Sequence, residues 1–294
     1  MSLPTVLRRL LLVLAALLII TLVGGGVVWW WLNPSCTREI GVVYGTRAGQ
    51  ALTMDVVTPS DPNGRGILLM MSGSWKSNPG AFRTFMAAPL IRRGYTVFAV
   101  YHISQPTVTI MEVVEDVHRA ARFVRHHAEE YGIDPDQIGV TGASSGGHLS
   151  LMLATGAGKG PLDETDPVDR ERSAVQAVAI FFPVTDLLNL GSSTENPGDG
   201  GPPIHYVKGF GPEAKGMAVW KKIGRAVSPI YHIDESLPPV LIVQGAADTL
   251  TPPEQSEWFR DRAREQGKDV ELILLPGKGH GWYTFVWDML RDTE

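Results

Sequence analysis

One stretch of the sequence decides the fold, and it reads Thr141-Gly142-Ala143-Ser144-Ser145-Gly146-Gly147-His148. Residues 137–140 before it are short and apolar, as in a buried strand, and residues 149–154 after it are typical of a helix. The Gly-x-Ser-x-Gly spacing between them is that of a nucleophile elbow, a strained strand-to-helix turn that presents a serine hydroxyl at the top of a sheet. Glycine is needed at both ends because a Cβ would collide where the two backbones meet. A Gly- and Ser-rich surface loop is the alternative interpretation.

Two adjacent serines leave the frame of this motif to be settled. Ser144 has glycine two residues before and two residues after it, whereas Ser145 would need a glycine at Ala143. We therefore predict that Ser144 is the nucleophile and that the backbone N–H of Ser145 donates to the oxyanion of the intermediate. A second oxyanion donor is expected from the Ser-Gly-Ser-Trp loop after an earlier strand, at the backbone N–H of Gly73 or Ser74.

Composition and charge exclude several classes of function. The chain has 294 residues, of which 44% are hydrophobic and 19% charged, as is ordinary for a globular protein. Its formal net charge is −5, with no basic stripe outside the N-terminus, so no nucleic-acid partner is expected. Cys36 is the single cysteine, which excludes an internal disulfide and a cysteine-based metal site. The eight histidines show no metal-ligand spacing, so a metalloenzyme is not expected.

The N-terminal segment predicts a membrane anchor or an export signal. After a pair of arginines, residues 10–32 carry no charge, and that length is enough to cross a bilayer core of about 30 Å at about 1.5 Å per residue. Tryptophans at residues 29–31 fit an interfacial aromatic belt, and the arginines favour a cytoplasmic N-terminus. We therefore expect an anchor in residues 1–36 in the cytoplasmic membrane, with an extracytoplasmic (periplasmic) body. Secretion after signal cleavage is the main alternative, and lipidation of Cys36 is a minor one.

Strands and helices are predicted to alternate along the rest of the chain. Residues 40–44 and 52–57 favour an antiparallel hairpin. Further strands are predicted at residues 66–71, 96–101, 137–140, 175–182, 239–244 and 270–275. Helical spacing of apolar residues occurs at residues 109–131, 253–266 and from 281 to the end. This alternation predicts a mostly parallel sheet with helices on both faces, in one domain over residues 37–294.

Residues 187–230 interrupt the alternation of strands and helices. They contain several clusters of glycine and proline, followed by a short helical pattern near residues 213–223. A long excursion between strands is usually a lid or a binding loop. A plain surface loop is an equal alternative, so the sequence leaves the role of this segment open.

A serine nucleophile needs a base to remove its proton, and the base needs an orienting carboxylate. In this topology the order along the chain is serine, then aspartate or glutamate, then histidine. His280 lies in a glycine-rich loop after the last strand, at the edge of the sheet where ligand-binding groups gather. Asp248 follows the preceding strand and is the predicted acid, with Asp186 as its rival. We expect His148 to pack beside the elbow helix. The other histidines are expected to be structural or solvated: His102, His118, His126, His127, His205 and His232.

With these residues in place, the chain resembles the α/β-hydrolase superfamily, and within it the hormone-sensitive-lipase and feruloyl or acetyl-xylan carboxylesterase branch. The likeness covers about residues 40–290 and rests on three motifs in the right order. They are Tyr-Gly-Ile-Asp-Pro leading into Gly-Ala-Ser-Ser-Gly-Gly-His-Leu, Gly-Ala-Ala-Asp followed by Pro252, and Gly-His-Gly at residues 279–281. The resemblance implies that Ser144, Asp248 and His280 hydrolyse carboxylic esters through an acyl-enzyme, without a cofactor.

The sequence departs from the family pattern at two places. Family members commonly carry His-Gly-Gly-Gly, often followed by Trp, at the oxyanion loop. Here the loop reads Met71-Ser72-Gly73-Ser74-Trp75. Backbone N–H groups survive any change of side chain, but the loss of two glycines bears on oxyanion binding and on substrate range. The aspartate usual beside the nucleophile is replaced by Ala143.

These observations together predict a membrane-tethered serine esterase for a small-molecule or carbohydrate-linked ester. A peptidase of the prolyl-oligopeptidase type has the same fold and is the first alternative, disfavoured because the sequence contains no propeller or other selecting domain. A non-catalytic binding protein on a hydrolase scaffold is the second alternative, disfavoured by the intact set of nucleophile, base and acid.

Overall fold

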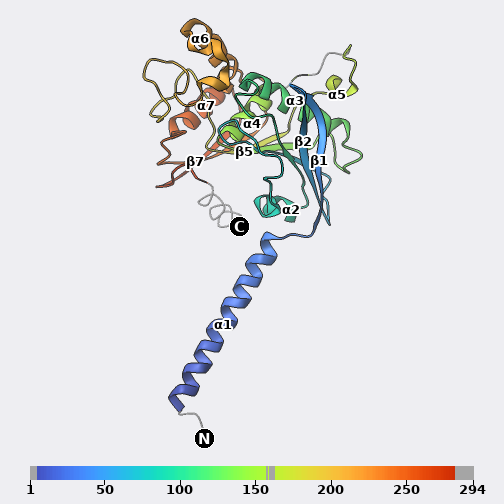
Figure 1. Cartoon of the computed structure of the whole chain (residues 1–294), viewed down its shortest axis with the longest axis vertical. Coiled ribbons are helices and arrows are strands. Elements are labelled where there is room, and N and C mark those ends of the chain that lie inside the picture. Colours follow the sequence, from blue (N-terminus) through green and yellow to red (C-terminus); the bar gives the residue numbers. More distant parts are fainter. Residues whose placement is uncertain (1–4, 157, 159–162, 282–294) are drawn as a thin grey trace.

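The computed structural model describes residues 5–156, 158 and 163–281, and the body is built around an eight-stranded sheet (Figure 1). In the sheet the strands follow the order β1-β2-β4-β3-β5-β6-β7-β8. The strands are β1 (Cys36–Arg47), β2 (Gln50–Pro59), β3 (Gly66–Met70), β4 (Thr96–Val100), β5 (Ile138–Ala143), β6 (Ala177–Phe181), β7 (Val240–Gly245) and β8 (Val270–Leu275). The pairs β1–β2 and β2–β4 are antiparallel, and the other pairs are parallel. The predicted sheet, mostly parallel and led by an antiparallel hairpin, is confirmed.

The β1–β2 hairpin turns through two residues rather than the longer loop that the sequence indicated. Ala48 and Gly49 have φ angles of 49° and 73°, both in the left-handed region. Two consecutive left-handed residues make a type I′ turn, whose twist matches that of the flanking strands. The strands therefore continue to Arg47 and from Gln50, with residue pairing up to the turn.

Helices cover both faces of the sheet, as predicted. They are α2 (Ala88–Arg92), preceded by the 3-10 turn η1 (Thr84–Ala87), and α3 (Ile110–His126), α4 (Ser145–Thr155), α5 (Pro167–Arg170) and α7 (Pro253–Glu265). Figure 1 shows α3, α4 and α7 on one side of the sheet and α2 on the other. Helix α3 begins at a capping box, in which Thr109 and Glu112 each accept a hydrogen bond from the other's backbone N–H. The helix predicted from residue 281 to the end lies outside the described residues.

Strand β4 is covered on both of its faces by helices. All five of its residues are buried, and successive side chains point to opposite faces. Val97 and Ala99 pack with Ile91 of α2 in the smaller core. Phe98 and Val100 belong to the larger core, on the side of α3 and α4. Burial on both faces explains why this strand reads as a continuous apolar run in the sequence.

The excursion at residues 187–230 is a packed part of the body. It contains η2 (Val207–Phe210), η3 (Pro212–Lys215), α6 (Met217–Ala226) and the start of η4 (Pro229–Tyr231). Trp220 is fully buried, and its ring lies 5.0 Å from that of Phe210. Phe210 in turn contacts Trp75, with ring centroids 5.9 Å apart. This aromatic chain attaches the excursion to the loop that follows β3.

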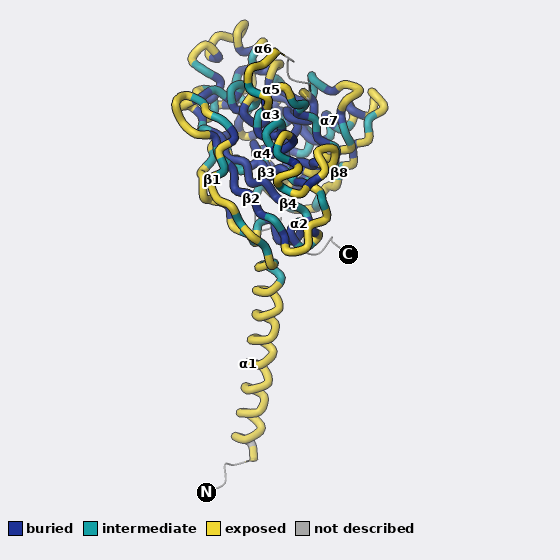
Figure 2. The backbone as a smooth tube through the Cα atoms, turned by 90° about the vertical axis from the view of Figure 1, so that its right-hand side faces the viewer, coloured by how far each residue is buried: buried dark blue, intermediate teal, exposed yellow. Residues whose placement is uncertain are grey.

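Helix α1 (Thr5–Leu32) protrudes from the body, and its surface is exposed along nearly its whole length (Figures 1 and 2). Its apolar stretch from Leu7 to Leu32 is long enough to cross a membrane, although a signal sequence would meet the same criterion. The guanidinium of Arg92 lies 4.0 Å from the centre of the Trp30 ring. It also donates hydrogen bonds to the carbonyls of Trp30 and Trp31, at the negative end of the helix dipole. Arg92 therefore joins α2 to the end of α1.

Candidate active site

The turn between β5 and α4 has the backbone strain of a nucleophile elbow. Ser144 adopts φ 55° and ψ −122°, which a residue with a Cβ rarely does. The glycines beside it are required by close approach. A Cβ on Gly142 would lie 2.5 Å from the carbonyl group of Gly146, and one on Gly146 would lie 2.7 Å from the carbonyl oxygen of Met70. The sequence folds this way because only glycine lets β3, β5 and α4 approach so closely.

Three side chains from distant parts of the chain meet at this turn. His280 Nε2 lies 3.1 Å from Ser144 Oγ, and His280 Nδ1 lies 2.8 Å from Asp248 Oδ2. The ring of Phe182 packs edge-on against that of His280, with centroids 4.6 Å apart. An imidazole so placed can accept the serine proton at one nitrogen while its other N–H donates to a carboxylate. The structure thus brings Ser144, Asp248 and His280 together.

The Asp248 carboxylate is held in place by its own turn. Oδ1 accepts hydrogen bonds from the N–H groups of Leu250 and Thr251, at 2.9 and 3.0 Å. Burial raises the pKa of this carboxyl. The hydrogen bond and charge of His280, together with the two N–H groups, outweigh burial and hold the pKa below its ordinary value of 3.8. The carboxylate is therefore ionised at neutral pH and favours a proton on the facing nitrogen of His280.

Thr251 is a further member of this group that the sequence analysis missed. Its hydroxyl lies 3.0 Å from Asp248 Oδ2 and 3.1 Å from His280 Nδ1. It also lies 3.0 Å from the carbonyl oxygen of Phe182. The one signal in the sequence is its place three residues after Asp248, where a turn returns the chain toward that carboxylate.

Asp186, the rival acid, has other partners. Its carboxylate accepts hydrogen bonds from the N–H groups of Leu188 and Asn189, at 2.9 and 3.1 Å. Its second oxygen accepts one from the hydroxyl of Tyr231, at 2.9 Å. These contacts fasten the start of the excursion to its end. Of the two candidate acids, the structure therefore places Asp248 beside His280.

The loop after β3 keeps an unusual backbone despite the missing glycines. Ser74 and Trp75 have φ angles of 54° and 51°, in the region that favours glycine. The N–H of Gly73 donates to the carbonyl of Lys76 at 2.9 Å, so it is already engaged. Ser145 is the first residue of α4, and an N–H at that position has no acceptor within the helix. Of the three residues expected to donate to an oxyanion, Ser145 and Ser74 therefore fit better than Gly73.

A chain of side-chain hydrogen bonds links this loop to α4. His102 Nδ1 lies 2.8 Å from the carbonyl oxygen of Ile103, and His102 Nε2 lies 2.9 Å from Ser72 Oγ. Burial lowers the pKa of His102 to about 4, so the ring is neutral at neutral pH. A carbonyl only accepts, so Nδ1 carries the hydrogen and Nε2 accepts from Ser72. The oxygen of Ser72 must then accept from the hydroxyl of Ser145, 3.1 Å away.

His102 is predicted from the sequence only as a structural or solvated residue, although it lies two positions after β4, where functional groups gather in such sheets. His148 is a second neutral histidine that fixes the site. Its Nδ1 accepts from the indole N–H of Trp75 at 3.0 Å, and its Nε2 donates to the carbonyl of Val227 at 2.7 Å. Burial lowers the pKa of His148 to about 4. His148 is itself a residue of α4 rather than a neighbour of that helix, and its ring ties α4 to the loop after β3 and to the excursion.

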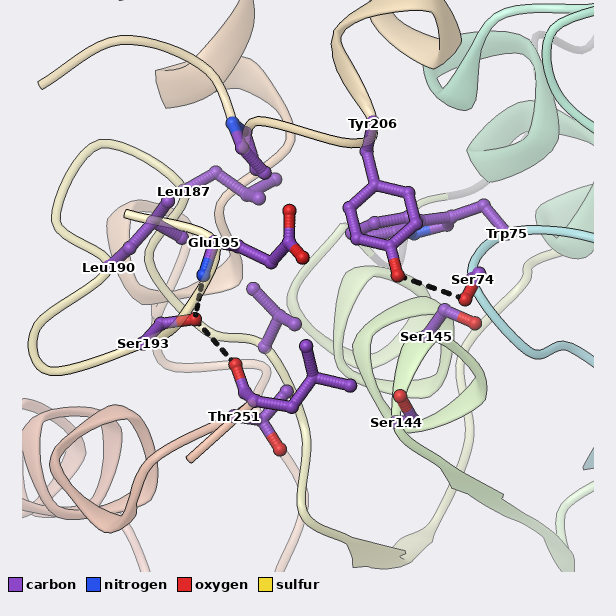
Figure 3. Close-up of a pocket in the computed structure, with 13 residues that line it drawn as sticks. Ser74, Trp75, Ser144, Ser145, Leu187, Leu190, Ser193, Glu195, Tyr206 and Thr251 are labelled. Carbon is purple, nitrogen blue, oxygen red and sulfur yellow. Dashed lines mark hydrogen bonds between the residues drawn. The ribbon is translucent and has the colours of Figure 1, made fainter. Parts of the chain in front are cut away.

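A small cavity opens onto Ser144 (Figure 3). The loop after β3 contributes Trp75 to its wall, and the rest is largely apolar, with Leu187 among its residues. The excursion contributes Tyr206, whose hydroxyl lies 3.1 Å from that of Ser74. It also contributes Glu195, the one acidic group among the described residues of the lining. The excursion therefore lines the cavity beside Ser144.

Comparison with known proteins shows the family of this chain. The model of the BD-FAE family matches residues 54–262, which is well over half of the chain. The chain belongs to the BD-FAE family. This BD-FAE chain is 28% identical over 220 residues to Esterase LipQ of Mycobacterium tuberculosis, covering 74% of this chain and 50% of LipQ. It is 30% identical over 199 residues to the probable carboxylic ester hydrolase LipM of the same organism, covering 66% of this chain and 43% of LipM. The chain thus spans about half the length of the curated relatives it matches.

Solved structures confirm the α/β-hydrolase fold of this BD-FAE chain. Native esterase Est2 of Thermogutta terrifontis superimposes with a TM-score of 0.67 at 25% identity, covering 88% of this chain and 91% of Est2. A truncated carbohydrate esterase from gut microbiota superimposes with a TM-score of 0.68 at 24% identity, covering 87% of this chain and 94% of that one. The resemblance to the carboxylesterase branch of the superfamily, drawn from three motifs, is therefore confirmed.

Proposed function

We propose that this protein is a serine carboxylic-ester hydrolase that works through an acyl-enzyme. The observation that carries the proposal is the alignment of His280 between two partners, 3.1 Å from Ser144 Oγ and 2.8 Å from Asp248 Oδ2. The names of the curated relatives support ester chemistry. So does the structural neighbour Est2, which is known with butyrate bound.

In the proposed mechanism, Ser144 Oγ attacks the ester carbonyl while His280 Nε2 takes its proton. The imidazolium is stabilised by Asp248, which is ionised because its pKa is held below the ordinary value. His280 then gives the proton to the leaving alcohol, and the acyl group stays on Ser144. Water, deprotonated by the same ring, attacks the acyl-enzyme and releases the acid.

The oxyanion of each tetrahedral intermediate is proposed to accept hydrogen bonds from the N–H groups of Ser145 and Ser74. Ser145 begins α4, so the positive end of the helix dipole faces the developing charge. Both residues line the cavity that contains Ser144. Gly73 is the weaker candidate because its N–H donates to Lys76.

We further propose that α1 tethers the catalytic domain, residues 37–294, to the cytoplasmic membrane. Support comes from the length and exposure of the apolar helix. The arginines at residues 8 and 9 favour a cytoplasmic N-terminus, which leaves the body on the extracytoplasmic side. A secreted body, released by cleavage of this segment, is the alternative.

Two assays test the assignment of the nucleophile: labelling by a fluorophosphonate probe and hydrolysis of p-nitrophenyl acetate. The wild-type chain and Ser145→Ala should both be labelled, since the alanine keeps the backbone N–H at residue 145. Ser144→Ala should lose labelling and turnover while staying folded. Full turnover by Ser144→Ala would refute the mechanism. Failure of the probe to label the wild type would favour a non-catalytic binding protein, and faster hydrolysis of an aminoacyl amide than of the matching ester would favour a peptidase.

A further inference from the structure

The cavity beside Ser144 contains a buried carboxylate that the mechanism does not use. Glu195 is 8% exposed, and it lies among apolar and aromatic neighbours that include Leu187 and Tyr206. Figure 3 shows its carboxylate pointing into the cavity, across from Ser144. Burying a charged group in such surroundings is costly unless hydrogen-bond donors compensate it. A plain apolar ester would leave that cost in place.

The protein itself provides only part of that compensation. The backbone N–H of His205 donates to Glu195 Oε2 at 3.0 Å, and the ring Nδ1 of His205 lies 2.9 Å from Oε1. An ionised carboxylate has about four acceptor positions on its two oxygens. Within the part of the chain that the structure describes, no other residue donates to this carboxylate. Acceptor positions therefore remain on the side that faces the cavity.

The backbone around Glu195 is attached to the turn that holds Asp248. The N–H of Thr194 donates to the carbonyl of Thr249 at 2.9 Å, and the hydroxyl of Ser193 donates to the carbonyl of Leu250 at 2.6 Å. These bonds fix the carboxylate relative to Ser144 and His280 rather than leaving it on a mobile arm. A recognition group held in this way is suited to selecting one geometry of substrate.

We propose that Glu195 selects the substrate by accepting a hydroxyl donor, or facing a cationic ammonium group, in the part of the ester that enters this cavity. The inference rests on the proposed ester hydrolysis and narrows its substrate class. Esters with a hydroxyl or a cation near the reacting carbonyl should be preferred over plain alkyl esters. Esters that carry a carboxylate at the same place should be rejected by like charge.

Three matched pairs of esters test this inference on the full-length chain. Glyceryl monoacetate against propyl acetate varies hydroxyl groups on the alcohol side. p-Nitrophenyl 3-hydroxybutyrate against p-nitrophenyl butyrate varies a hydroxyl on the acyl side. Acetylcholine against 3,3-dimethylbutyl acetate varies charge at constant shape. The variants are Glu195→Leu and Glu195→Gln, with Glu213→Gln as the control, because Glu213 is an exposed acid of the same excursion outside the cavity lining.

The wild type and Glu213→Gln should prefer the polar member of at least one pair, by about tenfold in kcat/KM, the size expected of a hydrogen bond to a charged group. Glu195→Leu should erase that preference, so that the ratio of kcat/KM within the pair falls by about tenfold. Glu195→Gln keeps an amide oxygen that can accept a hydrogen bond but has no charge. It should therefore retain part of a preference for hydroxyl groups and lose a preference for cations. If Glu195→Leu does not fold, Glu195→Gln provides the test.

Two results would overturn the inference while the proposed function stands. In the first, the wild type hydrolyses the esters, and Glu195→Leu shows the same ratio of kcat/KM as the wild type within every pair. The second is an equal loss on both members of every pair, which would mean that Glu195 only supports the fold. Absence of turnover by the wild type on all six esters would instead overturn the proposed function, and this inference with it.

Discussion

The side-chain hydroxyls of Ser72 and Ser145 lie 3.1 Å apart, and their contact joins the loop after β3 to the first turn of α4. The two proposed oxyanion donors lie on these same two segments. Because the neutral ring of His102 accepts from Ser72, the hydrogen between the two serines belongs to Ser145. A polar chain with one fixed direction thus holds the two halves of the proposed oxyanion hole together.

Ser72→Ala should lower kcat about tenfold on p-nitrophenyl acetate with little change in KM. The substitution removes no oxyanion donor, so the loss should be smaller than the hundredfold or more typical of deleting one. It should fall on kcat because donor placement matters most in the transition state. Ser77→Ala is the matched control, since its hydroxyl lies in the same loop but bonds the carbonyl of Met71. Equal losses in the two variants would show that the Ser72 contact has no special role.

Ser74 should be strained by its left-handed backbone, where other members of the superfamily commonly carry glycine. Its φ of 54° costs a residue with a Cβ about 1 kcal/mol or more. Ser74→Gly removes that strain but also the contact with the hydroxyl of Tyr206. In a Tyr206→Phe background the contact is already gone, so there Ser74→Gly should raise the free energy of unfolding by about 1 kcal/mol.

Urea denaturation of the four chains in this cycle measures both terms. The difference between the two backgrounds gives the energy of the contact between Ser74 and Tyr206. Destabilisation by Ser74→Gly in the Tyr206→Phe background would mean that the loop is not strained at this residue.

The fold and the central group of the site follow from local patterns in the sequence. Strands such as β4 read as continuous apolar runs because both faces are covered. The elbow can be recognised in the sequence because three backbones approach so closely that only glycine fits at residues 142 and 146. The order of serine, acid and base along the chain, together with the position of each residue after a strand, favoured Asp248 over Asp186 and indicated His280. What Ser144, Asp248 and His280 do together remains the proposal that labelling tests.

The roles of the residues around Ser144, Asp248 and His280 could not be predicted from the sequence, because those roles depend on tertiary contacts. His102 and Ser72 lie in loops that follow different strands, and nothing in the sequence signals their hydrogen bond. Glu195 sits in a glycine- and proline-rich excursion with no periodic pattern, and only the packing of that segment turns its side chain into the cavity. Two of the histidines expected to be structural or solvated, His102 and His205, contact Ser72 and Glu195 at the site.

The full-length chain should behave as an integral membrane protein with its body outside the cytoplasm. After carbonate washing it should stay with the membranes at its full length, because residues 10–32 remain as the anchor. Protease added to spheroplasts should digest the body, and replacing both arginines at residues 8 and 9 by glutamate should lower that accessible fraction. A shortened, freely soluble chain would instead show that the segment is cleaved.

Acid should destabilise the fold through two buried histidines and one partly buried histidine. Burial lowers the pKa of His102, His118 and His148 to about 4 each, against 6.5 in the unfolded chain. Between pH 6.5 and 4 the unfolded chain therefore binds more protons than the folded one, so the free energy of unfolding falls as pH falls. Each histidine contributes about 1.4 kcal/mol per pH unit within that window. Burial raises the pKa of Asp116 to about 6. Below that pH the folded chain binds this proton more readily than the unfolded chain, so Asp116 offsets the contribution of about one of the three histidines.

Urea denaturation of the full-length chain in detergent, at steps between pH 7 and pH 4.5, measures this slope. The free energy of unfolding should change by about 3 kcal/mol per pH unit near pH 5. His118→Gln should reduce this slope by about 1.4 kcal/mol per pH unit, the contribution of one proton. His118 is the best site for the substitution because its ring lies away from Ser144, hydrogen-bonded to Ser173. The assignment of neutral histidines would be wrong if the His118→Gln chain kept the wild-type slope, or if the wild type became more stable on acidification over this range.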